Sequence, residues 1–341
     1  MKNNQLDEAD PVPLVKLLPS LKEYSSLNFN GFKKSINELK VKVFSEIEDC
    51  YELWEKFSPK ESLFDLWDFR YAWYLGYRYK PYFYSLIYKK QILGFVPLWY
   101  DPVKKRYEWF GSDWMEDNKF FVIDKIFIPL LIKILPKPYH LNAILPEYNS
   151  FSGLELGLEF DEPKYIFYLE KIKNIDDFLL YLEKKNRFNL KHDYFKILSL
   201  APQVVFDYQN KMENLLQLKQ LSKQRFNGIS RDWSDFIIKQ RLNTYKNLVI
   251  KNNIFKTKFI KVYIQKRLAA IDLIITYKDR YYSLKGANDV ERFCGIGNFM
   301  NYLEFSDAIT NGYKIIDCLQ GDYNWKNKYY LPLRLLKLES F

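Results

Sequence analysis

The sequence predicts a mixed α+β protein with two similar domains. The chain has 341 residues, which is about twice the usual length of one domain. Its apolar patterning indicates helices, then strands joined by short turns, then a helix and a strand, and this order occurs twice. A content of 48 % hydrophobic and 28 % charged residues excludes a disordered chain. We expect a lead-in over residues 1–40, a first domain over 41–164 and a second over 165–341.

The first half contains two helices followed by a strand hairpin. Apolar spacing places its elements at 41–44 (strand), 47–57 (helix), 63–77 (helix), 82–88 and 92–100 (strands) and 125–135 (helix). The turn 89–91 (Lys-Lys-Gln) separates two apolar runs and is typical of a hairpin. The helix over 63–77 is aromatic on most faces, so we expect it to be buried.

The second half repeats this order with more elements. They are predicted at 165–169 (strand), 175–198 (helix), 204–208 (strand), 211–226 and 233–250 (helices), 255–264, 268–277 and 280–285 (strands), 298–310 (helix) and 314–319 and 329–338 (strands). The polar pairs between the three central strands predict an antiparallel meander. Asn311 and Gly312 predict a left-handed end to the helix before them.

Charge is distributed unevenly between the two halves. Residues 166–341 hold 30 lysines and arginines against 18 acids, a net charge of +12, while residues 1–165 have a net charge of −2. Such an excess suggests a polyanionic partner for the second half: a phosphorylated cofactor, a nucleic acid or an anionic surface. A solvated lysine-rich face explains the excess equally well.

Several classes of protein are excluded by the residues that the chain lacks. It has two histidines, neither with a cysteine or second histidine at ligand spacing, so we expect no metal site. No Gly-x-Ser-x-Gly elbow of a hydrolase occurs. The apolar run 126–135 is too short to span a bilayer, so we expect no integral membrane association. The acidic N-terminus and three distant cysteines (Cys50, Cys294, Cys318) predict a cytoplasmic protein.

The most informative segment is residues 292–297 (Arg-Phe-Cys-Gly-Ile-Gly), between a predicted strand and a predicted helix. Glycines at such a junction let the backbone approach a ligand, and the free N–H groups of the helix start favour phosphate. A glycine there could instead supply an unusual backbone angle. The substitution Gly297→Val separates the two interpretations: it should abolish ligand binding in the first case and destabilise the fold in the second.

This segment resembles the acyl-CoA-binding motif of the GNAT superfamily, Arg/Gln-x-x-Gly-x-Gly/Ala at a strand-to-helix junction. Four further segments resemble the CelD/FemAB-like acyltransferases within it: 86–98, 107–111 with Asp117, 185–191, and 321–326, where Trp325 replaces the usual Tyr. The resemblance runs from about Val41 to Leu338. It implies two tandem GNAT-like domains, each with a mostly antiparallel central sheet flanked by helices.

The resemblance also implies a donor site for acetyl-CoA or another acyl-CoA in the second domain. The loop and helix start would hold the pyrophosphate, with Arg292 adding charge. The preceding strand would hold the pantetheine arm through its backbone. The implied residues are Arg292, Gly295, Ile296, Gly297 and Asn298 for the pyrophosphate and Tyr282, Ser283, Leu284 and Lys285 for the arm.

Acyl transfer to an amine needs a base, a group that stabilises negative charge and an acid for the leaving thiolate. Asp322 is the candidate base, Lys326 the candidate for charge stabilisation and Tyr329 the candidate acid. Asp322 could instead only form a turn, and Lys326 could be a solvated loop residue. Arg187, on the basic helix, could contact an anionic acceptor or form a surface salt bridge.

The expected function is therefore N-acyl transfer: an acyl group, expected to be acetyl, passes from acyl-CoA to an amine of a small molecule or of a glycan or cell-envelope precursor. A Fem-like transferase that uses aminoacyl-tRNA is the first alternative. Residues 211–251 have room for only two ordinary helices, which argues against the long coiled-coil arm common in those ligases. A non-catalytic GNAT-fold binding protein is the second alternative.

Overall fold

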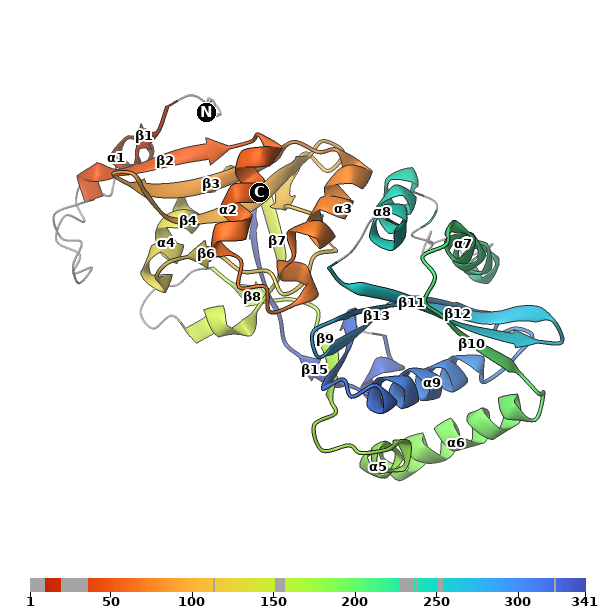
Figure 1. The fold of residues 1–341 in the computed structure, drawn as a ribbon. Helices are drawn as coiled ribbons and strands as arrows, with labels where there is room; N and C mark the ends of the chain where they lie inside the picture. The colour runs from red at the N-terminus through yellow and green to blue at the C-terminus, as the bar shows by residue number, and fades with distance from the viewer. Residues whose placement is uncertain are drawn as a thin grey trace. The chain divides into compact units, whose positions relative to one another are not determined.

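The computed structural model describes residues 10–19, 36–112, 114–150, 157–226, 236, 238–250, 254–321 and 323–341, with only the backbone at 149, 150 and 226. The chain divides into two compact units (Figure 1). The first comprises Met1–Tyr74, Arg78–Asp161 and Leu335–Phe341, and the second Leu75–Tyr77 and Glu162–Arg334. Each unit is built on its own sheet.

The first unit contains a nine-stranded sheet in the order β1-β2-β3-β4-β5-β7-β16-β8, with β6 paired to β4. Its strands are β1 (Val12–Pro13), β2 (Leu39–Phe44), β3 (Pro81–Tyr88), β4 (Gln91–Asp101), β5 (Arg106–Trp109), β6 (Phe121–Val122), β7 (Tyr139–Ile144), β8 (Glu159–Phe160) and β16 (Leu336–Ser340). Its helices are α1 (Leu14–Leu17), α2 (Ile47–Phe57), α3 (Trp67–Tyr77, whose last three residues fall in the second unit) and α4 (Ile128–Lys133). The predicted hairpin is confirmed as β3 and β4.

The second unit contains a seven-stranded sheet in the order β10-β11-β12-β13-β14-β9-β15. Its strands are β9 (Lys164–Tyr168), β10 (Gln203–Asp207), β11 (Lys256–Ile264), β12 (Arg267–Tyr277), β13 (Arg280–Asn288), β14 (Ile315–Gln320) and β15 (Leu331–Leu333). Its helices are α5 (Ile175–Tyr181), α6 (Lys184–Leu198), α7 (Met212–Phe226), α8 (Lys239–Ile250) and α9 (Ile296–Thr310). The meander β11-β12-β13 is antiparallel as predicted, while β13 and β14 pair in parallel.

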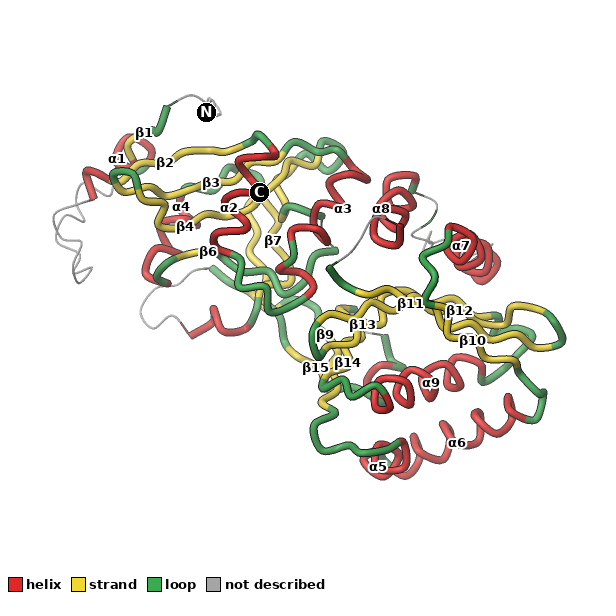
Figure 2. The backbone as a smooth tube through the Cα atoms, in the orientation of Figure 1, coloured by secondary structure: helices red, strands yellow, loops and turns green. Residues whose placement is uncertain are grey.

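Helices cover both faces of the second sheet (Figures 1 and 2). Helix α9 packs against β12 and β13, and α6 packs on α9 from the far side. Leu190 and Ile197 of α6 are fully buried, and the Tyr194 ring stacks on Tyr302 of α9 at 3.9 Å. Helix α7 contacts β12 and β13 from the opposite face. The strand-to-helix junction that leads into α9 is therefore held in place from both sides.

Three predicted elements are each divided in the structure. The expected helix over 63–77 is a short 3₁₀ helix (Leu63–Asp65) followed by α3, because Leu66 is extended (φ −79°, ψ 129°). The expected helix over 175–198 is two helices, because Leu182 is extended (φ −74°, ψ 148°) and Glu183 is the N-cap of α6. The expected last strand over 329–338 is also two strands, β15 and β16, which lie in different sheets. Strand β16 pairs with β7 and β8 of the first unit, although the sequence assigned it to the second domain. Strand partners are set by contacts between residues far apart in sequence, which local patterning does not contain.

The fold class is the expected one: mixed α+β, with two mostly antiparallel sheets, each flanked by helices. Among the helices that the structure describes, none combines the length and apolar character needed to cross a bilayer.

Candidate functional site

The segment that links β13 to α9 is a tight, hydrogen-bonded loop. Asp289 anchors it: its N–H donates to the Ala269 carbonyl of β12 (2.9 Å), and its carboxylate accepts from the Arg292 backbone N–H (3.2 Å). The Arg292 guanidinium lies 3.5 Å from the same carboxylate but is largely exposed. The Ile296 N–H donates to the Phe293 carbonyl (3.0 Å), so the loop closes as α9 begins. The Phe299 amide donates to the Gly295 carbonyl (3.0 Å), so in the first turn the amides of Gly297 and Asn298 are left for an outside acceptor.

The two glycines of this loop have different roles. Gly295, the N-cap of α9, has φ +99°, a backbone conformation that disfavours any other residue. Gly297 lies inside the first turn of α9, and a Cβ there would meet only Asn288 Nδ2, at an ordinary 3.6 Å. The unusual angle therefore belongs to Gly295, while Gly297 has room for a Cβ. Glycine weakens a helix by about 0.5–1 kcal/mol relative to alanine, and neither the backbone angle nor the atoms around position 297 require it there.

A polar network from three elements borders the helix start. Asn298 in the first turn of α9 donates from Nδ2 to Asp193 Oδ2 of α6 (2.6 Å) and accepts from the Tyr329 hydroxyl (2.9 Å). A Cβ at Gly295 would come within 2.9 Å of Asp193 Cγ. Burial and the nearby Asp193 carboxylate raise the pKa of Tyr329 to about 12, so its hydroxyl is protonated at neutral pH. The network places both the Tyr329 hydroxyl and the Asp193 carboxylate beside the loop.

The strand predicted to hold the pantetheine arm has a bulge and a short parallel ladder. Leu284 is the extra residue, since Lys285 pairs with Leu273 and Ser283 with Ile274 of β12. The ladder between β13 and β14 covers Arg280–Tyr282 with Ile315–Asp317. Residues 283–288 lie beyond this ladder, so β14 does not pair with this part of β13. Tyr282 is fully buried, whereas Ser283, Leu284 and Lys285 are partly exposed.

Two buried carboxyl groups lie beside this strand, and the sequence analysis missed them. Glu304 of α9 accepts from the Ser283 hydroxyl at 3.0 Å, and the carboxyl group of Asp272 in β12 lies close enough to raise the pKa of Glu304. A Cβ at Gly286 would overlap Asp272 Oδ1. Burial raises the pKa of both acids, to about 7 for Asp272, and the Asp272 carboxyl raises the pKa of Glu304 further. The sequence offered one signal for this pair: Asp272 is the single acid in the largely apolar strand β12.

A cavity of about 230 Å³ lies next to the loop. It is lined by α7 and by the residues that lead into the loop: Leu221, Gln224, Arg225 and residues 288–292. Burial lowers the pKa of Arg225, which the Asp272 carboxylate opposes. The side-chain Oδ1 of Asn288 is buried and has no hydrogen-bond partner among the described atoms. Polar groups of this kind can orient a ligand.

The predicted catalytic residues have different surroundings. Lys326 is buried, and its Nζ donates to the carbonyl oxygens of Leu319 (3.1 Å) and Gln320 (2.9 Å) at the end of β14, so it is not a solvated loop residue. Asp322 lies outside the described residues. Arg187 is half-buried in the first turn of α6. The structure thus gathers Arg292, Asn298 and Tyr329 around the start of α9 and gives Lys326 a backbone-binding position.

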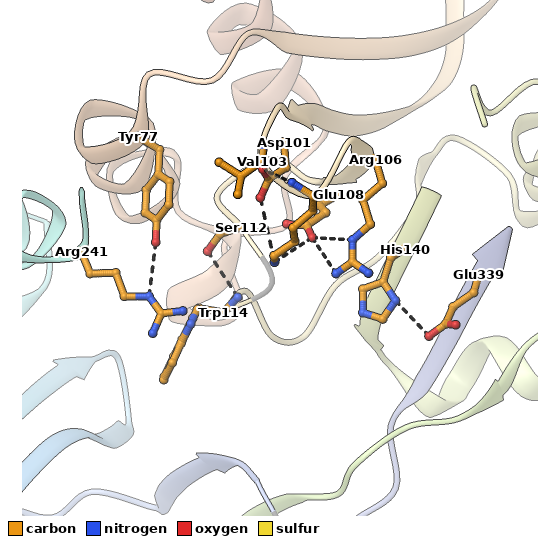
Figure 3. Close-up of polar contacts among 11 residues, drawn as sticks. Tyr77, Asp101, Val103, Arg106, Glu108, Ser112, Trp114, His140, Arg241 and Glu339 are labelled. Atoms are coloured by element: carbon orange, nitrogen blue, oxygen red, sulfur yellow. Dashed lines mark hydrogen bonds and ion pairs between the residues drawn. The ribbon is translucent and has the colours of Figure 1, made fainter. Parts of the chain in front are cut away.

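The first unit contains a separate polar cluster (Figure 3). Glu108 of β5 is almost fully buried, and its Oε1 lies 2.9 Å from Lys104 Nζ and 2.8 Å from Arg106 Nη2. His140 Nδ1 of β7 lies 2.9 Å from Glu339 Oε1 of β16, across adjacent strands. Both groups of contacts join neighbouring backbone segments, so we interpret them as contacts that stabilise this sheet.

Comparison with protein families supports the resemblance for part of the chain. Residues 254–327 match the family model described as an acetyltransferase (GNAT) domain, and these residues run from just before β11 to the segment after β14. The match therefore covers the meander, the glycine loop and α9. A search of curated proteins finds no match. Among the described residues, no group of three histidine, cysteine or acidic side chains is arranged to hold a metal ion.

Comparison with solved structures shows the same fold over most of the chain. FemX aligns with a TM-score of 0.51 and 12 % identity, over 87 % of this chain and 95 % of that one. A tandem GNAT protein from the clavulanic acid biosynthesis pathway aligns with a TM-score of 0.53 and 10 % identity, over 89 % and 98 %. The C-terminal domain of a putative lysylphosphatidylglycerol synthetase from Agrobacterium fabrum gives 0.51 and 10 %, over 85 % and 91 %. The fold is thus that of the tandem GNAT proteins.

Proposed function

We propose that the chain is an acyl-CoA-dependent N-acyltransferase. It would transfer an acyl group, in the simplest case acetyl, to an amine of a small molecule or of a glycan or cell-envelope precursor. The observation that carries the proposal is Gly297: a helical glycine with room for a Cβ, at the helix start that follows the glycine loop. The GNAT-family match over residues 254–327 includes this position.

The residues around the loop fit an acyl-CoA with one exception. The Gly297 and Asn298 amides and the exposed Arg292 side chain would hold the pyrophosphate, and the β13 backbone over 283–285 would hold the pantetheine arm. The exception is the Asp193 carboxylate, which lies against Gly295 and disfavours an anion there. The Asp193 carboxylate is held by Asn298 Nδ2 (2.6 Å) and by His192 Nδ1 (3.1 Å), so its side chain would have to leave these two partners to relieve the repulsion.

The reaction assigns distinct roles to the residues of the second unit. The amine nitrogen bonds to the acyl carbon, the carbon–sulfur bond breaks, a base takes the amine proton and the thiolate receives a proton. Tyr329, protonated at neutral pH, is the proposed acid, and Asp322 remains the proposed base. Lys326 binds two carbonyl oxygens at the end of β14, so we assign it a positioning role for the segment that leads to Asp322.

Thiol release from acetyl-CoA in the presence of a panel of amines tests this function. We expect release that depends on both the protein and one class of amine. Tyr329→Phe should lower kcat more than it raises KM, since the hydroxyl acts on the leaving group. Wild-type protein that is folded and releases no thiol with any amine or acyl chain would contradict the proposal.

Two observations favour a second candidate, transfer from aminoacyl-tRNA. A carboxylate beside the loop suits a donor that places no pyrophosphate there, and the net charge of +12 over residues 166–341 suits RNA. Filter binding of total tRNA over a range of salt concentrations separates the candidates. Tight binding that weakens steeply with salt supports tRNA as the donor, and weak, flat binding removes it.

A further inference from the structure

Helix α6 presents an outward face that combines aromatic and basic side chains. We define the α6 outer face by six residues: Lys184, Lys185, Phe188, Lys191, Phe195 and Lys196. All six are exposed, and the two phenylalanines are unusually so, at 68 % for Phe188 and 61 % for Phe195. The opposite side of the helix, with Leu190 and Ile197, is buried against α9. Figure 1 shows α6 as the outer layer, with α9 between it and the sheet.

The two phenylalanines point the same way. They are seven residues apart, so they lie almost on one line along the helix and about 10 Å from each other. Lys184 and Lys191 lie on one side of this line, and Lys185 and Lys196 lie on the other. The helix therefore presents two apolar rings on one face, with lysines on both sides of them. Apolar side chains are also exposed at both ends of the helix: Leu180, Tyr181, Leu198 and Leu200.

The charge of this face is strongly one-sided. Helix α6 contains five lysines and arginines and a single acid, Asp193. That acid is turned toward α9, where its carboxylate accepts from Asn298. A second copy of the chain placed on this face would bring lysine against lysine, which disfavours a symmetric dimer. The complementary partner is anionic and takes up apolar rings.

An anionic lipid surface meets both requirements. Phosphate headgroups attract the lysines, whose flexible stems let the ammonium groups stay in the headgroup layer while the rings enter the acyl boundary. A nucleic acid would satisfy the lysines, but it would not bury two rings that are two helical turns apart and point outward together. We propose that the α6 outer face binds the surface of an anionic membrane, with α6 parallel to the bilayer plane and Phe188 and Phe195 inserted. This proposal does not depend on the identity of the acyl donor.

Co-sedimentation of the full chain with lipid vesicles tests the proposal. The vesicles contain phosphatidylcholine alone or with about 30 % phosphatidylglycerol. We expect binding to the anionic vesicles only. The double variant Phe188→Ala/Phe195→Ala should weaken it about tenfold or more, because the rings supply the apolar area. Phe188→Trp/Phe195→Trp should retain it. Since both positions are exposed, the melting temperature of each variant should match that of the wild type.

Matched controls come from the first unit. Phe160→Ala removes a ring that is 61 % exposed, the same fraction as Phe195. Lys89→Glu/Lys90→Glu reverses two charges in the β3–β4 turn, as Lys184→Glu/Lys191→Glu does on α6. The control variants should bind vesicles as the wild type does, whereas the α6 charge reversal should weaken binding about tenfold or more.

Three results would overturn the proposal. Absence of binding to anionic vesicles is the first. Binding that responds to the α6 lysines but not to the phenylalanines is the second, since it means adsorption without insertion. The third is loss of tRNA binding in the α6 variants together with unchanged vesicle binding, which assigns the face to RNA. A protein that binds vesicles as expected but no acyl-CoA would leave this proposal standing and contradict only the proposed donor.

Discussion

Asp193 Oδ2 of α6 accepts a 2.6 Å hydrogen bond from Asn298 Nδ2 in the first turn of α9. This contact joins the basic helix to the glycine loop and places a carboxylate against Gly295. A negative charge at a helix N-terminus is favourable in the absence of a ligand, and the same charge opposes an incoming phosphate. The two helices therefore share a side chain that influences the proposed donor site.

Asp193→Asn should tighten the binding of acetyl-CoA. The amide keeps the size of the side chain and removes its charge, so we expect about a two- to fivefold lower Kd by calorimetry. Asp176→Asn, at an exposed position on α5, removes the same charge away from the loop and should leave the Kd unchanged. Weaker binding by Asp193→Asn would mean that the carboxylate supports the donor site instead of opposing it.

The two glycines of the loop should respond oppositely to alanine. Gly295→Ala forces a Cβ onto a residue at φ +99° and toward Asp193, so we expect a loss of about 1–3 kcal/mol in the free energy of unfolding. Gly297→Ala occupies open space inside a helix and should be neutral or stabilising by up to about 1 kcal/mol. Urea unfolding measures both. Equal destabilisation by the two substitutions would contradict the assigned difference.

The buried pair Asp272 and Glu304 should make stability depend on pH. Burial raises the pKa of both carboxyls above the unfolded value of about 4. The folded protein therefore holds a proton more tightly than the unfolded chain, and its stability falls as pH rises above that value. Asp272→Asn removes one of the two acids. Between about pH 5 and pH 8 the variant should gain about 1–3 kcal/mol relative to the wild type. If the melting temperatures of the wild type and the variant changed in parallel with pH, the pair would not be the cause of the pH dependence.

The ion pair of Lys164 and Asp317 should be essential for stability. Lys164 Nζ lies 2.6 Å from Asp317 Oδ2, with both side chains almost fully buried between β9 and β14. Lys164→Met would leave a buried charge without its cation, so we expect a loss of about 3–5 kcal/mol. Lys314→Met breaks an exposed pair with Asp279 at 3.8 Å and should change stability by less than about 0.5 kcal/mol. A similar small effect at Lys164 would show that Asp317 does not need this partner.

Local sequence signals predicted most helices and strands, whereas pairings between strands far apart in the sequence were missed. The hairpin β3–β4, the meander β11–β13 and the end of α9 at Gly312 (φ +73°) follow from apolar periodicity and turn residues within a few positions. The pairing of β16 with β7 does not, because it joins residues nearly 200 positions apart. The break at Leu182 was missed because the apolar spacing continues through it.

The candidate site shows the same limit. The glycine motif identified the loop, but the sequence did not distinguish Gly295, whose backbone angle is unusual, from Gly297. Lys326 was expected to stabilise negative charge, and whether it does so or only binds carbonyl oxygens depends on side-chain placement. Glu304 and Ser283 meet only because α9 packs on β13. Such contacts are tertiary and have no signature in local spacing.

Calorimetric titration of acetyl-CoA into wild type and Gly297→Val tests the proposed donor site most directly. A Cβ at this position has room, and valine is a better helix former than the glycine that it replaces. Its branched side chain would block close approach to the first turn of α9. We predict saturable binding by the wild type, together with a folded Gly297→Val protein of similar melting temperature that has lost most of its affinity. Equal affinity of the two proteins would remove Gly297 from the site. A folded wild type that binds no acyl-CoA would contradict the proposed donor site and the proposed acyl-CoA-dependent activity.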